Sequence, residues 1–191
     1  MTKAKVRDKY RGLSRQELLD KAYELGSNYE IKSTSCSQST VAAVHELLDI
    51  DDVIVQAATS LCGGSANQFL GTCGALSGGI MILDCYTGRP AEKMSHRERI
   101  QANIDALEPA SVAPELLADK FWKEYGTIIC AQIHRQLFGR IFGLSDPDEM
   151  EKFENLGGHS DPAKCASVVG KAAQWVMEIL LDKGIVQLQN Q

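Results

Sequence analysis

The chain of 191 residues is long enough for one domain with its own hydrophobic core. Its composition, 44% hydrophobic and 24% charged, is that of a globular protein and excludes a disordered one. A net charge of -5 argues against a general nucleic-acid binder, which usually carries a basic surplus. We therefore expect a folded protein that does not bind nucleic acid.

Two segments bear on the location of the protein. Residues 1–11 are basic, but no apolar segment follows them, so they do not have the pattern of a secretory signal. The longest uncharged stretch, 53–83, contains Gln56, Asn67 and Gln68 and is interpreted as buried chain, not as a membrane span. We expect a cytoplasmic protein without membrane association, in a compartment where thiols are kept reduced.

Helix-start and helix-stop signals recur along the chain. Ser14 and Glu17 have the spacing of a capping box, and apolar residues follow them at helical spacing. Start signals, which include N-caps and a first-turn proline, stand at Ser14, Ser35, Asp51, Thr72, Ser95, Pro114, Thr127, Asp146 and Asp161. Predicted helix ends lie at Gly26, Gly63-Gly64, Gly88, about Leu107, Gly126, Gly139 and Gly184.

These signals predict the fold class. No segment shows the period-two alternation of a strand or a hairpin turn between two strand-like runs. We predict an all-α protein, a single-domain bundle of about seven to nine helices. The helical, cysteine-rich domain is expected over 13–185, between a basic flexible tail over 1–12 and a flexible tail over 186–191.

Six cysteines are more than such a chain needs. In a cytoplasmic protein this number indicates metal binding or redox chemistry, although a single free cysteine is more often a small buried hydrophobe. Their positions separate them into two groups. Those expected in the first turn of a predicted helix are Cys36, Cys73, Cys130 and Cys165, and those expected near helix ends are Cys62 and Cys85. A helix N-terminus favours the thiolate, which is both the nucleophile and the metal ligand.

Glycines and histidines near these cysteines have two interpretations each. Gly74, Gly78 and Gly79 lie inside a predicted helix, where glycine costs about 1 kcal/mol relative to alanine. They indicate either the close approach of a backbone or an inorganic cluster, or tight helix packing. His134, four residues after Cys130, has workable metal-ligand spacing, but a lone histidine is more often a surface or capping residue. A loop position is expected for His159, with the same two interpretations.

Short motifs in one order resemble those of the C-GCAxxG-C-C family of redox-active proteins. The resemblance extends from about Leu18 to Leu181 and rests on 35–41, on 73–81, on 121–130 and on Cys165 with Val168-Val169. The four cysteines of the family label fall on Cys36, Cys73, Cys130 and Cys165. The match is not complete, because Thr72 replaces the glycine before the second cysteine and Gly74 is inserted before Ala75.

The resemblance implies a function. A related domain of split-Soret cytochromes carries an iron–sulfur centre beside its haem. The resemblance therefore implies an iron–sulfur cluster here, with [2Fe–2S] the favoured type, bound by Cys36, Cys73, Cys130 and Cys165 and used in electron transfer or redox sensing. It also implies a possible homodimer, and a redox partner protein that the sequence does not identify.

Two other functions stay open at this point. One is a thiol–disulfide oxidoreductase that uses two of these cysteines, although no Cys-x-x-Cys motif is present. The other is a structural zinc site of four cysteines, or of three cysteines with His134. The sequence contains no separate acid–base constellation, so whether the protein is an enzyme also stays open.

Overall fold

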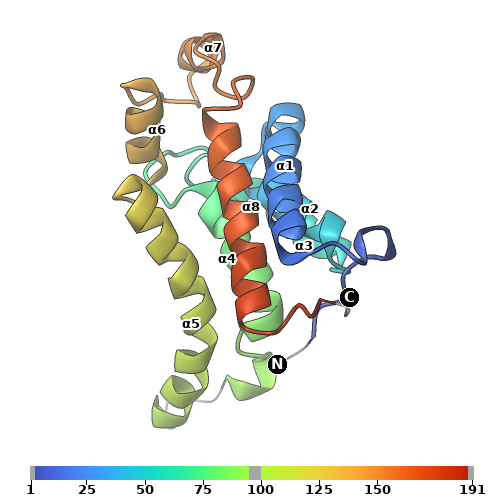
Figure 1. The fold of residues 1–191 in the computed structure, drawn as a ribbon. Helices are drawn as coiled ribbons and strands as arrows, with labels where there is room; N and C mark the ends of the chain where they lie inside the picture. The colour runs from blue at the N-terminus through green and yellow to red at the C-terminus, as the bar shows by residue number, and fades with distance from the viewer. Residues whose placement is uncertain (1–2, 95–99, 189–191) are drawn as a thin grey trace.

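The computed structural model describes residues 3–94 and 100–188, and in these residues it contains eight α-helices and no sheet (Figure 1). The helices are α1 (Arg15–Ser33), α2 (Cys36–Leu47), α3 (Asp52–Ala57), α4 (Gly74–Thr87), α5 (Ile100–Tyr125), α6 (Cys130–Phe138), α7 (Pro147–Asn155) and α8 (Cys165–Asp182). Three short 3-10 helices cover Asp8–Tyr10, Thr59–Leu61 and Ala91–Lys93. The predicted all-α bundle is confirmed.

Helix α8 is the central helix of the bundle. Its buried residues, from Ala166 to Leu180, are small or apolar. Its most extensive packing is against α1. Helices α2 and α4 also contact it, and α5 lies along α4. In Figure 1, α6 and α7 lie at the end of the bundle where α8 begins. Segments that are far apart in sequence therefore meet around the start of α8.

Helix α1 does not end at Gly26 as predicted but continues to Ser33. A Cβ atom at position 26 would lie 2.9 Å from the carbonyl oxygen of Val169 and 3.1 Å from the Cα of Gly170. Gly26 thus allows α1 and α8 to approach closely, and the prediction failed because glycine also marks helix ends. The actual end is Thr34, whose backbone is left-handed with φ 55°.

The two helices predicted on either side of Pro114 are one helix, α5, with Pro109 and Pro114 inside it. Proline removes a backbone N–H and usually interrupts a helix. Here one apolar stripe continues past both prolines and is buried, at Ala110, Ala113, Leu117, Phe121 and Tyr125. This burial decides the structure of the segment. The start predicted at Ser95 lies outside the described residues.

The described part of the predicted N-terminal tail is hydrogen-bonded to the bundle. The backbone N–H of Ala4 donates to the carbonyl of Ile185 over 3.0 Å, and that of Arg7 donates to Leu47 over 2.9 Å. The segments around Ala4 and Ile185 therefore lie side by side. Figure 1 shows the whole bundle that they join. The flexibility of residues 1–12 and 186–191 stays a prediction.

Candidate functional site

Four helix starts carry the four predicted cysteines to one cavity. Cys36, Cys130 and Cys165 are the first residues of α2, α6 and α8, and Cys73 directly precedes α4. The cavity has a volume of about 400 Å³, and all four cysteines line it. Its apolar walls include Ile133, Leu144, Val168 and Val169. The sequence separation of these cysteines is thus no obstacle to a joint site.

A short antiparallel pairing aligns two of the helix starts. The backbone N–H of Cys73 donates to the carbonyl of Ile128 over 2.8 Å, and the N–H of Cys130 donates to Gly71 over 3.0 Å. Thr72 and Ile129 form the bridge between these two bonds. The pairing fixes the start of α4 beside the start of α6, and so it places Cys73 and Cys130 on the same wall of the cavity.

The cavity also receives a fifth cysteine, Cys62, which the sequence placed with Cys85. The Cys62 thiol donates to Oδ1 of Asn67, with a distance of 3.6 Å between sulfur and oxygen. Cys62 begins a tight loop in which Gly63, Gly64, Ser65, Ala66, Asn67 and Phe69 all have positive φ angles. Cys85 is exposed on α4, where its thiol donates to the carbonyl of Met81, and it does not line the cavity.

The glycines of α4 serve both purposes that the sequence left open. A Cβ atom on Gly74 would lie 2.4 Å from Sγ of Cys36 and 3.0 Å from Cα of Cys62, so this glycine makes room for the site. A Cβ atom on Gly78 would lie 2.4 Å from the backbone oxygen of Ser37, and one on Gly79 would meet side chains of α5 and α8. Gly78 and Gly79 therefore allow helix packing.

The helix starts do not make these cysteines thiolates on their own. Burial raises the pKa of Cys73 to about 11, although the backbone N–H groups of Ala75 and Leu76 act in the opposite direction. Burial also raises the pKa values of Cys36, Cys130 and Cys165, and the nearby cysteines raise them further. The loss of hydration on burial raises the thiol pKa more than the helix N-terminus lowers it. Without a cation in the cavity, the thiols stay protonated at neutral pH.

His134 is buried beside the cysteines, not on the surface. Its Nε2 lies 3.6 Å from Sγ of Cys165, and its ring stacks on Phe153 with centroids 5.1 Å apart. Further ring contacts come from Phe69, Phe138 and Phe142. Burial lowers the pKa of His134 to about 4, so the ring is neutral at physiological pH. Its Nδ1 has no hydrogen-bond partner in the structure.

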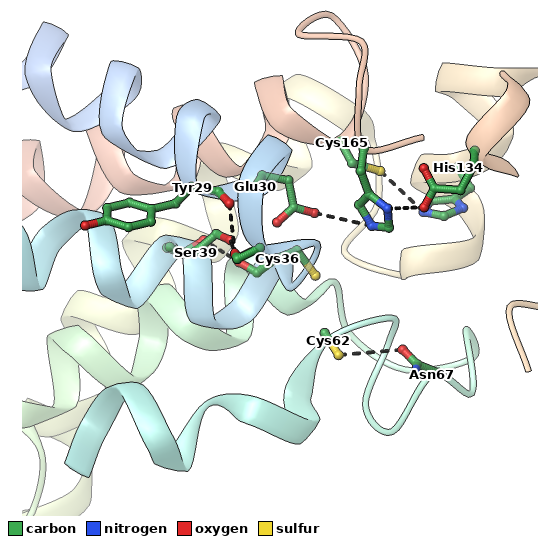
Figure 2. A network of polar contacts seen from close by, with 12 residues as sticks. Tyr29, Glu30, Cys36, Ser39, Cys62, Asn67, His134 and Cys165 are labelled. Atoms are coloured by element: carbon green, nitrogen blue, oxygen red, sulfur yellow. Dashed lines mark hydrogen bonds and ion pairs between the residues drawn. The ribbon is translucent and has the colours of Figure 1, made fainter. Parts of the chain in front are cut away.

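A carboxyl group that the sequence did not indicate as a site residue lines the same cavity. Glu30 of α1 is 1% exposed, and Figure 2 shows it among Cys36, Cys165 and His134. Burial raises the pKa of Glu30 to about 7. The missed signal was periodicity, since Glu30 continues the buried stripe of Leu19, Ala22 and Gly26 at helical spacing.

The Glu30→Gln variant should change how the stability of the metal-free protein depends on pH. Because the pKa of Glu30 is about 7 when folded and near 4.5 in the reference state, the folded wild type binds more protons between these values. Its free energy of unfolding should therefore fall as the pH rises from 4.5 to 7, a contribution of about 3 kcal/mol at most. Urea unfolding at pH 5 and pH 8 should show the variant gaining stability relative to wild type, and an unchanged difference would contradict this.

The side chains that line the cavity include donors that suit a metal centre. Five cysteine thiols line it, and the imidazole of His134 lies beside one of them. Thiolates are soft ligands that suit iron–sulfur clusters and zinc, and imidazole suits zinc and iron. In residues 3–94 and 100–188, no group of three His, Cys, Asp or Glu side chains is placed to hold one metal ion.

The fold and the site together define an all-α bundle in which five cysteines line one cavity. A family model described as "Putative redox-active protein (C_GCAxxG_C_C)" matches residues 34–179, so the chain belongs to this family. All four predicted cysteines lie within the matched residues. No significant match was found among the curated proteins or among the solved structures. Within the described ranges, no helix combines the length and apolar character needed to cross a membrane.

Proposed function

We propose that the cavity binds an iron–sulfur cluster of the [2Fe–2S] type through Cys36, Cys73, Cys130 and Cys165. The protein would then act in electron transfer or redox sensing, the finer form of the redox activity that its family description states. The observation that carries this proposal is the meeting of these four cysteines in one cavity, from four separate helix starts.

A metal that binds in the cavity would have to displace the protons of these thiols, whose pKa values are raised by burial. A bound metal makes a coordinating thiol lose its proton, and it supplies the positive charge that the buried thiolates lack. When bound, the cluster supplies reversible one-electron chemistry. The protein residues hold it and exclude water. Ile133, Leu144 and Val168 form an apolar surround, and His134 lies next to Cys165.

A second candidate function is thiol–disulfide exchange, which one observation favours. The Cys62 loop packs directly on Cys130, since a Cβ atom on Gly64 would lie 3.1 Å from Cβ of Cys130. The charge of Cys62 also raises the pKa of Cys130, although burial is the larger cause. Two neighbouring thiols could therefore cycle with a disulfide substrate. Zinc bound by four cysteines, or by three with His134, is the remaining alternative.

Spectra of protein purified without oxygen separate these functions. The cluster predicts a coloured protein whose visible absorption is bleached by dithionite. Colourless protein with stoichiometric zinc would contradict the proposal. Metal-free protein that reversibly loses two thiols on mild oxidation would also contradict it, in favour of the second candidate.

The cellular location and the partners that we propose for this protein are inferred from its sequence. Six free cysteines suit a reducing compartment, so we place the protein in the cytoplasm. A redox partner protein, still to be identified, would exchange electrons with the centre. Homodimer formation stays a prediction, as does the absence of nucleic-acid binding. Size-exclusion chromatography with light scattering tests the first of these.

A further inference from the structure

Glu30 stands out among the residues of the cavity because it is buried without a complete set of partners. It is 1% exposed, and its Oε2 has no hydrogen-bond partner in the structure. Burying an unpaired carboxylate is unfavourable. Leu19 and Ala22, on the same face of α1 as Glu30, are buried in the core. A group of this kind can exchange its proton when the charge beside it changes.

A chain of titratable groups leads from Glu30 to the solvent. The Oε1 of Glu30 lies 3.9 Å from Nε2 of His159, and Nδ1 of the same ring lies 2.5 Å from Oε1 of Glu154. The exposed fractions of the side chains rise along this chain, from 1% for Glu30 to 14% for His159 and 42% for Glu154. In Figure 2, a dashed line leads from Glu30 toward the side of the site where Cys165 and His134 lie.

We propose that Glu154, His159 and Glu30 carry a proton between the solvent and the cysteine-lined cavity when the centre in that cavity gains or loses an electron. The inference rests on the proposed redox function. On reduction, one electron comes from a one-electron donor and one proton from water. Glu154 gives a proton to Nδ1 of His159, and the proton on Nε2 passes to Glu30 through one bridging water, because 3.9 Å is longer than a hydrogen bond. Reoxidation releases both the electron and the proton.

The direction of the coupling follows from electrostatics. An added electron places negative charge beside Glu30, which favours its protonated form. The groups that face Glu30 from each packed element are mostly acidic or neutral. They are Cys36 and Ser39 of α2, Cys73 before α4, Cys130 of α6, Glu154 of α7, His159 of the following loop and Cys165 of α8. His159 alone among them lowers the pKa of Glu30 by its charge.

The coupling has a measurable signature. If one proton accompanies each electron, a tenfold fall in proton concentration lowers the reduction potential by about 59 mV. The dependence should appear above the pH at which Glu30 of the oxidised, loaded protein ionises. Below that pH, Glu30 is protonated before the electron arrives, and the potential should change little with pH.

Redox titration of the loaded protein between pH 6 and pH 9 tests the inference. Wild type should approach the one-proton slope at high pH, and Glu30→Gln should remove it. Glu108→Gln, a matched change on the exposed face of α5 away from the cavity, should keep it. His159→Gln should keep the slope but slow reduction at pH 8 by about tenfold or more, since it interrupts the path.

The outcomes distinguish the inference from the function on which it rests. A reducible centre whose potential is independent of pH in wild type would overturn the proton path alone. A protein with no reducible centre would overturn the proposed function and the path with it. If Glu30→Gln does not fold, the redox-difference infrared spectrum of glutamate-labelled wild type replaces it. A carboxylic acid band that appears on reduction supports the path, and its absence overturns it.

Discussion

Single serine replacements of Cys36, Cys73, Cys130 and Cys165 should each lower the iron content of protein purified without oxygen at least about tenfold. Each replacement exchanges a thiol, which loses its proton to a metal, for a hydroxyl that does not do so at neutral pH. The four residues lie on four different helices or helix starts, so no one of them can replace another by local motion. Iron per chain, with the visible spectrum, measures the effect.

Cys85→Ser is the matched control for these variants. Cys85 is exposed on α4 and does not line the cavity, so its replacement should leave the iron content and the spectrum unchanged. Cys62→Ser should retain most of the iron, because Cys62 is outside the proposed ligand set. An equal loss of iron from all six variants would contradict the assignment.

Replacement of Gly74 by alanine should both destabilise the fold and disturb the site. The added Cβ atom would lie 2.4 Å from Sγ of Cys36, 2.9 Å from the carbonyl oxygen of Leu61 and 3.0 Å from Cα of Cys62. Two of these atoms belong to backbone, which cannot move aside as a side-chain end can. We expect the free energy of unfolding to fall by about 1–3 kcal/mol, as in overpacked cores. The gain in helix propensity, about 1 kcal/mol, is already included in that net loss.

Gly143→Ala is the control for the glycine variant. No atom lies within 4 Å of a Cβ atom at this exposed position, and its φ is not positive. The change should therefore alter the free energy of unfolding by less than about 0.5 kcal/mol and leave the iron content unchanged. Urea unfolding of both variants, with iron analysis, provides the comparison. A Gly74→Ala protein with wild-type stability and iron content would contradict the geometry described.

The cysteines at helix starts could be predicted because capping signals are local. Start signals at or before Cys36, Cys73, Cys130 and Cys165 placed them in first turns, and the structure has them at the starts of α2, α4, α6 and α8. Their protonation could not be predicted from that position. It depends on burial by the other helices, and burial outweighs the backbone N–H groups that act on Cys73.

Cys62 and Glu30 could be recognised as residues of the site only from the tertiary structure. Cys62 follows a short 3-10 helix, and its place in the cavity depends on the left-handed loop that packs on Cys130. The helix predicted to run to Gly63-Gly64 ends at Ala57, and the two glycines lie in the loop after the 3-10 helix. Glu30 lies on the buried stripe of α1, which the stop predicted at Gly26 cut short. Glu30 was not predicted as a site residue because the helix was predicted to end before it.

Helix lengths were the least predictable part of the fold. Gly26 was predicted to end a helix and Pro114 to begin one, yet both lie inside helices here. In each case a long-range contact decides the outcome. Gly26 lies against the backbone of α8, and the helix around Pro114 buries a stripe that includes Leu117 and Phe121. Local propensity is outweighed wherever packing between helices is extensive.

Iron and acid-labile sulfide analysis of protein purified without oxygen tests the proposed function most directly. A cluster bound in the cavity predicts equal amounts of iron and sulfide, both lost together when Cys73 is replaced by serine. Cys73 is the best residue for this test because it is buried in the cavity wall and paired through its backbone to the segment before Cys130. Protein that contains neither iron nor sulfide, or that binds zinc in their place, would contradict the proposal.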